Sequence, residues 1–220
     1  MTTAIPHIYF LLDRSGSMES MASDVIGGFN SFIKEQALDG GDALLTLVQF
    51  DGGDIHEVVT AATPIHEVAP LTSTSFVPRG NTPLFDAMGR LITDATIRAE
   101  ETDKEEVIMF VTFTDGEENA SREYSHSQIF DLVKNREAKG WTFVYLGANQ
   151  DSYASGRTMG YGADQVQDFE ASSDGAALAF SSLSKGMIRE RGKIRAKQQR
   201  DVSTFFEGDK EAEAALRAKP

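Results

Sequence analysis

Short apolar runs alternate along the chain with longer stretches in which apolar side chains recur every three or four positions. Runs of four to eight apolar residues are typical of buried strands, whereas the wider spacing is typical of amphipathic helices. The runs predict strands at residues 7–12, 43–50, 55–60, 107–113, 141–146 and 165–169. The spaced stretches predict helices at about residues 20–37, 83–95, 127–138, 153–159 and 176–187.

This order of strands and helices favours an α/β fold. Alternation of this kind implies right-handed crossovers and a mostly parallel sheet with helices on both faces. Asp51-Gly52-Gly53 predicts a tight turn between residues 43–50 and 55–60, so the second of these strands should be an antiparallel, half-exposed edge. We therefore predict a doubly wound, Rossmann-like sheet that is mostly parallel, with one antiparallel edge strand. Such sheets bind ligands beyond the carboxyl ends of their strands.

Composition narrows the classes of function. The 220 residues include 34 acidic and 21 basic side chains and no cysteine. The formal net charge of -13 argues against a nucleic-acid footprint over the whole surface, which would need a basic face. The lack of cysteine excludes disulfides, thiolate metal sites and cysteine nucleophiles. The first apolar run, at residues 8–12, is too short for a signal-peptide core or a membrane span, so we expect a cytoplasmic protein without a membrane partner.

The charge pattern changes near Lys185. Residues 185–200 contain seven basic side chains and a single acidic one, Glu190. We interpret residues 1–185 as the folded domain and residues 186–220 as a basic helical extension with a flexible tail.

The basic stretch has two interpretations. It lacks the interleaved aromatic residues of single-strand binders, which favours a solvated helix. An accessory role in binding nucleic acid or an acidic partner is the alternative. Phe205 and Phe206 follow in an otherwise polar tail, where they must either dock on the domain or meet a partner.

Oxygen-bearing side chains follow two of the predicted buried strands and precede one helix. Asp13, Ser15 and Ser17 follow the first strand, and Asp115 follows the most apolar one. Thr82 comes from the loop before a helix. Two carboxylates and three hydroxyls converging on one sheet edge form an all-oxygen site, which suits Mg²⁺, Mn²⁺ or Ca²⁺ and not zinc.

These five residues resemble the metal-ion-dependent adhesion site (MIDAS) of von Willebrand factor A domains. The family motif is Asp-x-Ser-x-Ser, then a distant Thr, then a distant Asp, and the chain matches it in order over roughly residues 5–185. The flanking residues Arg14 to Met18 and Thr114 to Gly116 look like the family's bacterial, stand-alone members.

The resemblance implies a cation held directly by the hydroxyls and partly through water by the carboxylates. Mg²⁺ is the expected cation, with Mn²⁺ and Ca²⁺ as alternatives. It also implies an open coordination position for an Asp or Glu of a partner protein. Bacterial relatives often serve as adaptors, beside ATPase complexes or in stress- and phage-related gene clusters. We expect Asn149, Gln150 and Glu118 to form a rim that contacts the partner.

Simpler local roles exist for each predicted ligand. Asp and Ser residues that follow a strand are usually helix caps, and Ser17 or Ser20 could cap the following helix. Thr82 before Pro83 could cap the next one, and Asp115-Gly116 could be an ordinary turn. The convergence of three separate segments argues against all of these at once.

Enzymatic alternatives find less support in the sequence, so we expect a binding module and not an enzyme. The four histidines show no spacing that pairs them as metal ligands, and nothing supplies a general base beside the site. A metal-dependent phosphoester hydrolase remains the alternative. It would need cations to hold a phosphate, and only Arg14 and Arg79 are candidates.

Overall fold

A computed structural model describes residues 4–148, 151–200, 205–206, 209 and 215. Its strands are β1 (Ile5–Asp13), β2 (Leu44–Phe50), β3 (Glu57–Pro64), β4 (Glu106–Thr114), β5 (Thr142–Ala148) and β6 (Val166–Phe169). Within the described residues, they form one six-stranded sheet in the order β3-β2-β1-β4-β5-β6. The β2–β3 pair is antiparallel and the other pairs are parallel, which confirms the predicted sheet and its edge strand.

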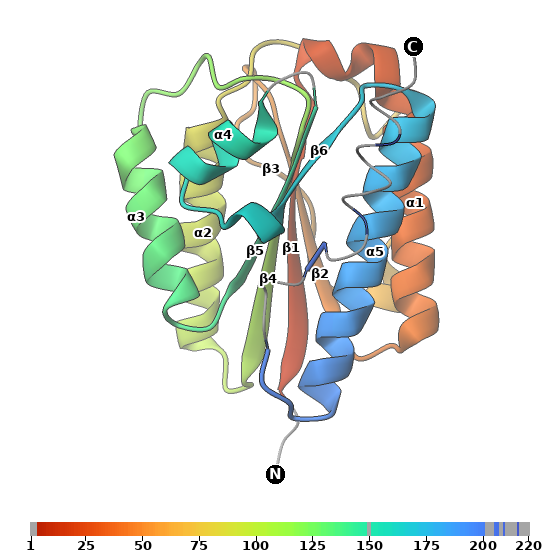
Figure 1. Ribbon diagram of the computed structural model, residues 1–220, viewed down its shortest axis with the longest axis vertical. Helices are drawn as coiled ribbons and strands as arrows, with labels where there is room; N and C mark the ends of the chain where they lie inside the picture. Colours follow the sequence, from red (N-terminus) through yellow and green to blue (C-terminus); the bar gives the residue numbers. More distant parts are fainter. Residues whose placement is uncertain (1–3, 149–150, 201–204, 207–208, 210–214, 216–220) are drawn as a thin grey trace.

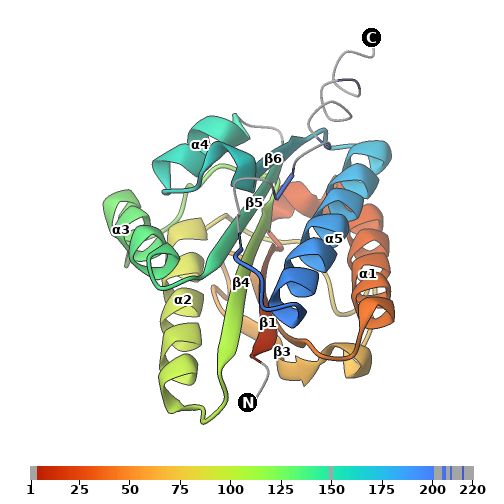
Figure 2. The same ribbon diagram turned by 60° about the horizontal axis from the view of Figure 1, so that its bottom comes forward.

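Helices cover both faces of the sheet, as the sequence predicts. The longer ones are α1 (Ala22–Asp39), α2 (Leu84–Glu101), α3 (His126–Glu137), α4 (Ser152–Thr158) and α5 (Ser173–Arg195). Helices α1 and α5 lie side by side on one face, and α2, α3 and α4 lie on the other (Figure 1), an arrangement that Figure 2 shows from below. Short 3-10 helices are η1 (Gly16–Met21), η2 (Ile65–Glu67) and η3 (Ala163–Gln165). Among the described residues, no helix is long and apolar enough to cross a membrane.

Strand β1 lies inside the sheet and is buried on both faces. Ile8, Phe10 and Leu12 belong to the core between the sheet and α1 and α5, whereas Tyr9 and Leu11 belong to the core under α2 and α3. Successive residues of a strand point to opposite faces. A strand covered on both faces therefore needs an unbroken apolar run, which is what the sequence has there.

Some boundaries differ from the predicted ones. Strand β3 continues to Pro64, and its pairing register with β2 shifts near Ala62, which has a φ of 47°. This is a bulge, a feature that lets an edge strand bend and that no apolar pattern encodes. Helix α2 begins at Leu84, with Pro83 as its capping residue, and runs to Glu101.

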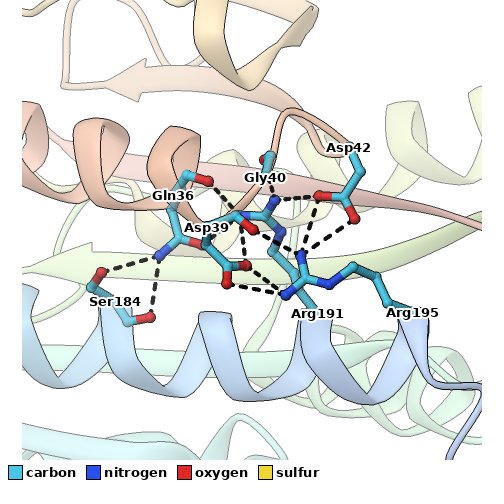
Figure 3. Close-up of polar contacts among 7 residues, drawn as sticks. All are labelled: Gln36, Asp39, Gly40, Asp42, Ser184, Arg191 and Arg195. Atoms are coloured by element: carbon cyan, nitrogen blue, oxygen red, sulfur yellow. Dashed lines mark hydrogen bonds and ion pairs between the residues drawn. The ribbon is translucent and has the colours of Figure 1, made fainter.

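Helix α5 continues beyond residue 187, where the predicted apolar spacing ends, and polar contacts with the end of α1 hold its last turns. The Arg191 side chain is fully buried and donates to the carbonyl oxygens of Gln36, at 2.8 Å, and Gly40, at 2.6 Å. It also pairs with Asp42, while Arg195 pairs with Asp39 at 2.9 Å (Figure 3). These bonds satisfy carbonyls at the end of α1, which lack helical partners.

Several basic side chains of the segment have partners within the chain. Lys193 pairs with Glu190 at 2.6 Å, Lys185 lies 3.6 Å from Asp209, and Arg189 donates to the carbonyl of Phe205. Helix α5 passes through residue 185 without interruption, so the change in composition there is not a change in secondary structure.

Phe205 and Phe206 dock on the domain. Their exposed fractions are 1% and 0%, and both belong to the core on the α1–α5 side of the sheet. The absence of a side chain at Gly186 makes room for the Phe205 ring, because a Cβ there would lie 2.4 Å from it. The predicted flexible tail therefore does not include these two residues.

Candidate metal centre

The predicted ligands lie at the carboxyl ends of β1 and β4, which are neighbours in the sheet. Asp13 is the last residue of β1, and Asp115 directly follows β4. The 3-10 helix η1 begins at Gly16, so the chain turns over the sheet edge soon after Asp13. The site therefore occupies the upper edge of the sheet in Figure 1.

Hydrogen bonds join four of the five predicted ligands. The Ser15 amide donates to Asp13 Oδ1 at 2.7 Å, and the Ser15 and Ser17 hydroxyl oxygens are 3.0 Å apart. The Ser17 hydroxyl donates to Asp115 Oδ1 at 2.6 Å. The chain thus brings these four side chains into one connected cluster of oxygen atoms.

Thr82 reaches the same cluster from the loop before α2. A Cβ placed on Gly116 would lie 3.1 Å from Thr82 Oγ1 and 3.4 Å from Ser17 Oγ. The two hydroxyls therefore face the same small space, which the glycine leaves open. A larger residue at position 116 would fill the place where the hydroxyls converge.

The helix-capping role considered for Thr82 is not realised. The capping residue of α2 is Pro83, with no side-chain cap. Instead, the amide of Phe85 donates to Glu118 Oε2 at 2.9 Å, and the amide of Asp86 donates to the Ser121 hydroxyl at 3.0 Å. These side chains satisfy the first amides of the helix.

Two residues that sequence reasoning missed hold predicted ligands in place. The Thr114 hydroxyl donates to Asp13 Oδ2 at 2.6 Å. Asn119 holds Thr82 on both sides: its side-chain oxygen accepts from the Thr82 backbone amide at 3.0 Å, and its backbone amide donates to the Thr82 carbonyl at 3.2 Å. The Thr114-Asp115-Gly116 motif was a signal for the first, but nothing local marks Asn119.

Burial raises the pKa of both carboxyl groups in the cluster. Asp13 is fully buried, and desolvation raises its pKa to about 7, against the lowering effect of hydrogen bonds from Thr114 and Ser15. Burial likewise raises the pKa of Asp115, opposed by the hydrogen bond from Ser17. The ionised site thus carries more negative charge than its hydrogen bonds offset, and a cation fits this oxygen-rich donor set.

Hydroxyl groups are essential to this donor set. Among the described residues, no group of three or more His, Cys, Asp or Glu side chains could hold a metal ion. A cation at this edge would therefore depend on Ser15, Ser17 and Thr82 together with the two aspartates.

Of the three predicted rim residues, the structure describes only Glu118. Asn149 and Gln150 lie outside the described residues. The Glu118 carboxylate is engaged inward, since it also accepts from the amides of Ala120 at 2.8 Å and Ser121 at 2.7 Å. A partner contact through Glu118 would have to compete with these bonds.

Arg14 and Arg79, the only candidates for holding a phosphate, are already paired. Arg14 donates to Asp51 Oδ2 through Nε at 2.8 Å and Nη2 at 2.6 Å, and it lies 2.6 Å from Glu57. Arg79 donates to the same Asp51 oxygen at 3.0 Å. Both guanidinium groups have Asp51 as a partner, which weakens the hydrolase alternative.

Comparisons with known proteins place this geometry in a structural class. No protein-family model matches the sequence, and no curated protein matches it. Solved structures do match. The pilus adhesin SpaC of Lactobacillus rhamnosus GG superposes with a TM-score of 0.65 at 15% identity, over 86% of this chain and 30% of its own.

Two further structures relate the fold to the metal site. Proximal thread matrix protein 1 of the mussel byssus, determined with a zinc-occupied MIDAS motif, has a TM-score of 0.56 at 16% identity, over 81% of this chain and 46% of its own. The SpRpn10 VWA domain has a TM-score of 0.54 at 12% identity, over 81% of this chain and 95% of its own. The chain therefore has the von Willebrand factor A fold. It spans less than half the length of the adhesin and the matrix protein.

Proposed function

We propose that this protein is a divalent-cation-dependent protein-binding module. Its metal ligands are Asp13, Ser15, Ser17, Thr82 and Asp115, and Mg²⁺ is the expected cation, with Mn²⁺ and Ca²⁺ as alternatives. One observation carries the proposal: three separate segments bring three hydroxyls and two buried carboxyl groups with raised pKa values to one edge of a von Willebrand factor A fold. A structural neighbour with a zinc-occupied MIDAS motif supports a divalent cation, and because zinc occupies a site of this type there, donor chemistry alone does not exclude zinc.

The ligand set suggests how a partner is held. Asp13 and Asp115 offset the two charges of a divalent ion, whereas the hydroxyls of Ser15, Ser17 and Thr82 are neutral. A bound cation would supply a Lewis-acidic position that accepts a carboxylate. The partner that fits this chemistry presents an Asp or Glu side chain. An ATPase or a stress- or phage-related complex remains the predicted source of that partner.

A non-enzymatic role is the better supported one. Arg14 is paired with Asp51 and Glu57 and Arg79 with Asp51, so the two candidates for holding a phosphate already have carboxylate partners. The basic segment of α5 gives little support to nucleic-acid binding, because Lys193 and Arg191 are paired within the chain. A phosphatase screen in Mg²⁺ tests the hydrolase alternative directly.

Divalent cations should stabilise the protein. Binding to the folded state alone adds about 2.7 kcal/mol to the free energy of unfolding at a hundredfold excess over Kd. Ser17→Ala should weaken this effect because it removes a ligand that bonds to both Ser15 and Asp115. The measurement is thermal unfolding in Mg²⁺ or Mn²⁺ against chelator.

A matched control comes from the same short helix. Ser20 is exposed and lies three residues further along η1, so Ser20→Ala should respond to cations like the wild type. If the wild type melts identically with cation and with chelator, the proposed metal centre is wrong.

Thr82→Ala should weaken partner binding more than cation binding, because it keeps both carboxylates and removes a neutral ligand. The measurement is recovery of partners from extract of the native cell, with and without chelator and with an acidic peptide as competitor. The control is Thr96→Ala, because the Thr96 hydroxyl donates within α2 to the Ile92 carbonyl. Recovery that survives chelator and Thr82→Ala alike would place the partner on another face.

A further inference from the structure

A single buried carboxylate, Asp51, lies where three loops meet beside the proposed metal centre. Asp51 follows β2, is fully buried, and is not among the five proposed ligands. Its Oδ1 accepts from the amides of Gly53 at 2.6 Å and Asp54 at 3.0 Å, which shapes the turn between β2 and β3. Its Oδ2 accepts from Arg14 and Arg79, as described above.

The two arginines belong to the loops that carry four of the five ligands. Arg14 lies between Asp13 and Ser15, and Arg79 lies three residues before Thr82. Asp51 therefore connects the loop of Asp13, Ser15 and Ser17 to the loop of Thr82.

Backbone contacts run parallel to this side-chain connection. The Arg79 amide donates to the Arg14 carbonyl at 2.8 Å, and the Gly16 amide donates to the Gly80 carbonyl at 3.0 Å. Gly80 has a φ of 69°, which favours glycine, and a Cβ on it would lie 3.2 Å from the Gly52 nitrogen. The loop that leads to Thr82 therefore also lies close against the turn that follows Asp51.

A second side chain reinforces the same connection. Arg14 Nη1 donates to the Gln49 side chain at 3.1 Å, and Gln49 in turn donates to the Ser75 carbonyl at 3.1 Å. The loop that leads to Thr82 is thus tied to Arg14 at two places, through Gln49 and through Asp51. Arg14 is 4% exposed and Asp51 is fully buried, so the Arg14–Asp51 pair is shielded from water, whereas the Arg79 side chain is half-exposed.

We propose that Asp51 is a positioning residue of the metal centre: it sets the distance between the Ser15–Ser17 loop and Thr82 without touching the cation. This inference rests on the proposed cation-binding function. Residues that orient metal ligands in this way typically change metal affinity by roughly 10- to 100-fold when they are replaced.

The test compares two aspartates at opposite ends of β2. Asp51→Asn keeps an oxygen for the Gly53 and Asp54 amides but places an NH₂ group against the donors of Arg14 and Arg79. Asp42→Asn is the control, because Asp42 pairs with buried Arg191 just before β2 begins (Figure 3). Strand β2 has 7 residues, so the two sites are about 20 Å apart.

Two measurements decide the proposal. The first is amide hydrogen exchange at Gly16 and Arg79 in chelator. The second is Mg²⁺ and Mn²⁺ affinity by calorimetry. We expect Asp51→Asn to raise both exchange rates and to weaken cation binding roughly tenfold or more. Even at a similar loss of stability, Asp42→Asn should leave the cation affinity unchanged and should not raise exchange at Gly16 and Arg79 above that of other amides. Should Asp51→Asn fold poorly, Arg79→Gln removes the same link from a half-exposed position and should behave alike.

Each contrary result has a distinct meaning. Protection of Gly16 and Arg79 that matches the Asp42→Asn variant overturns the proposal, whatever the cation affinity. Faster exchange with unchanged cation affinity overturns it as well, because the loops would move without consequence for the metal. A wild-type protein that binds neither Mg²⁺ nor Mn²⁺ would remove the proposed function itself, and the role of Asp51 with it.

Discussion

Asp13→Asn is expected to make the cation-free protein more stable than the wild type near pH 8 and to abolish its stabilisation by Mg²⁺. Asp13 is fully buried, and desolvation raises its folded-state pKa to about 7, well above the ordinary range of an aspartate. The folded state therefore holds this proton more tightly than the unfolded state does. The Asn side chain is neutral at every pH and can still accept from the Ser15 amide.

The sign of the pH dependence follows from linkage. Below about pH 4, Asp13 is protonated in both the folded and the unfolded state, so its burial does not lower the free energy of unfolding. Between about pH 4 and pH 7 the unfolded state loses the proton first, so the stability of the cation-free wild type falls as pH rises. The full penalty above pH 7 is at most about 4 kcal/mol. A bound cation would favour the ionised form, so cation stabilisation should instead grow over the same range.

Chemical denaturation of the wild type and Asp13→Asn between about pH 5 and pH 8.5, in chelator and in Mg²⁺, measures both effects. The difference in unfolding free energy should grow with pH in chelator and reverse its sign in Mg²⁺. Asp115→Asn should show the same sign, because burial also raises the pKa of Asp115. A difference that stays flat with pH in chelator would contradict the electrostatic account of the site.

The fold and the convergence of the proposed ligands could be predicted because their signals are local. The unbroken apolar run of β1 indicates a strand buried on both faces, and Asp13 follows it directly. The turn at Asp51-Gly52-Gly53 indicates the hairpin that makes β3 the antiparallel edge. Parallel strands bring their carboxyl ends to one edge, so Asp13 and Asp115 had to lie near each other once the strands were placed.

The residues that support the ligands could not be predicted because their partners are distant in sequence. Asp51 lies 37 positions from Arg14, and Asn119 lies 37 positions from Thr82. The turn signal at Asp51-Gly52-Gly53 does not indicate a partner for the Asp51 side chain, and Asn119 lies in no motif, so only the folded chain shows these pairings. The same holds for Arg191: a basic residue in a basic stretch reads as solvated, although it is fully buried against the end of α1.

Deletion of residues 201–220 is expected to cost most of the stability of the domain. Phe205 and Phe206 are 1% and 0% exposed, their rings meet edge to face at 4.9 Å, and Phe205 covers Gly186 of α5. Loss of a buried phenylalanine typically costs about 3–5 kcal/mol, against a total domain stability of about 5–15 kcal/mol. The deletion should also free Lys185 from Asp209.

A shorter deletion, of residues 210–220, is the matched control because it keeps Phe205, Phe206 and Asp209. Its urea midpoint of unfolding should be close to that of the wild type, whereas the longer deletion should unfold at a much lower urea concentration. The double variant Phe205→Ala/Phe206→Ala should reproduce most of the loss with the chain length unchanged. None of the proposed metal ligands lies in this segment, so cation affinity should survive in whatever fraction remains folded. Equal stability of the two deletions would mean that the aromatic pair adds nothing to the core, contrary to its burial.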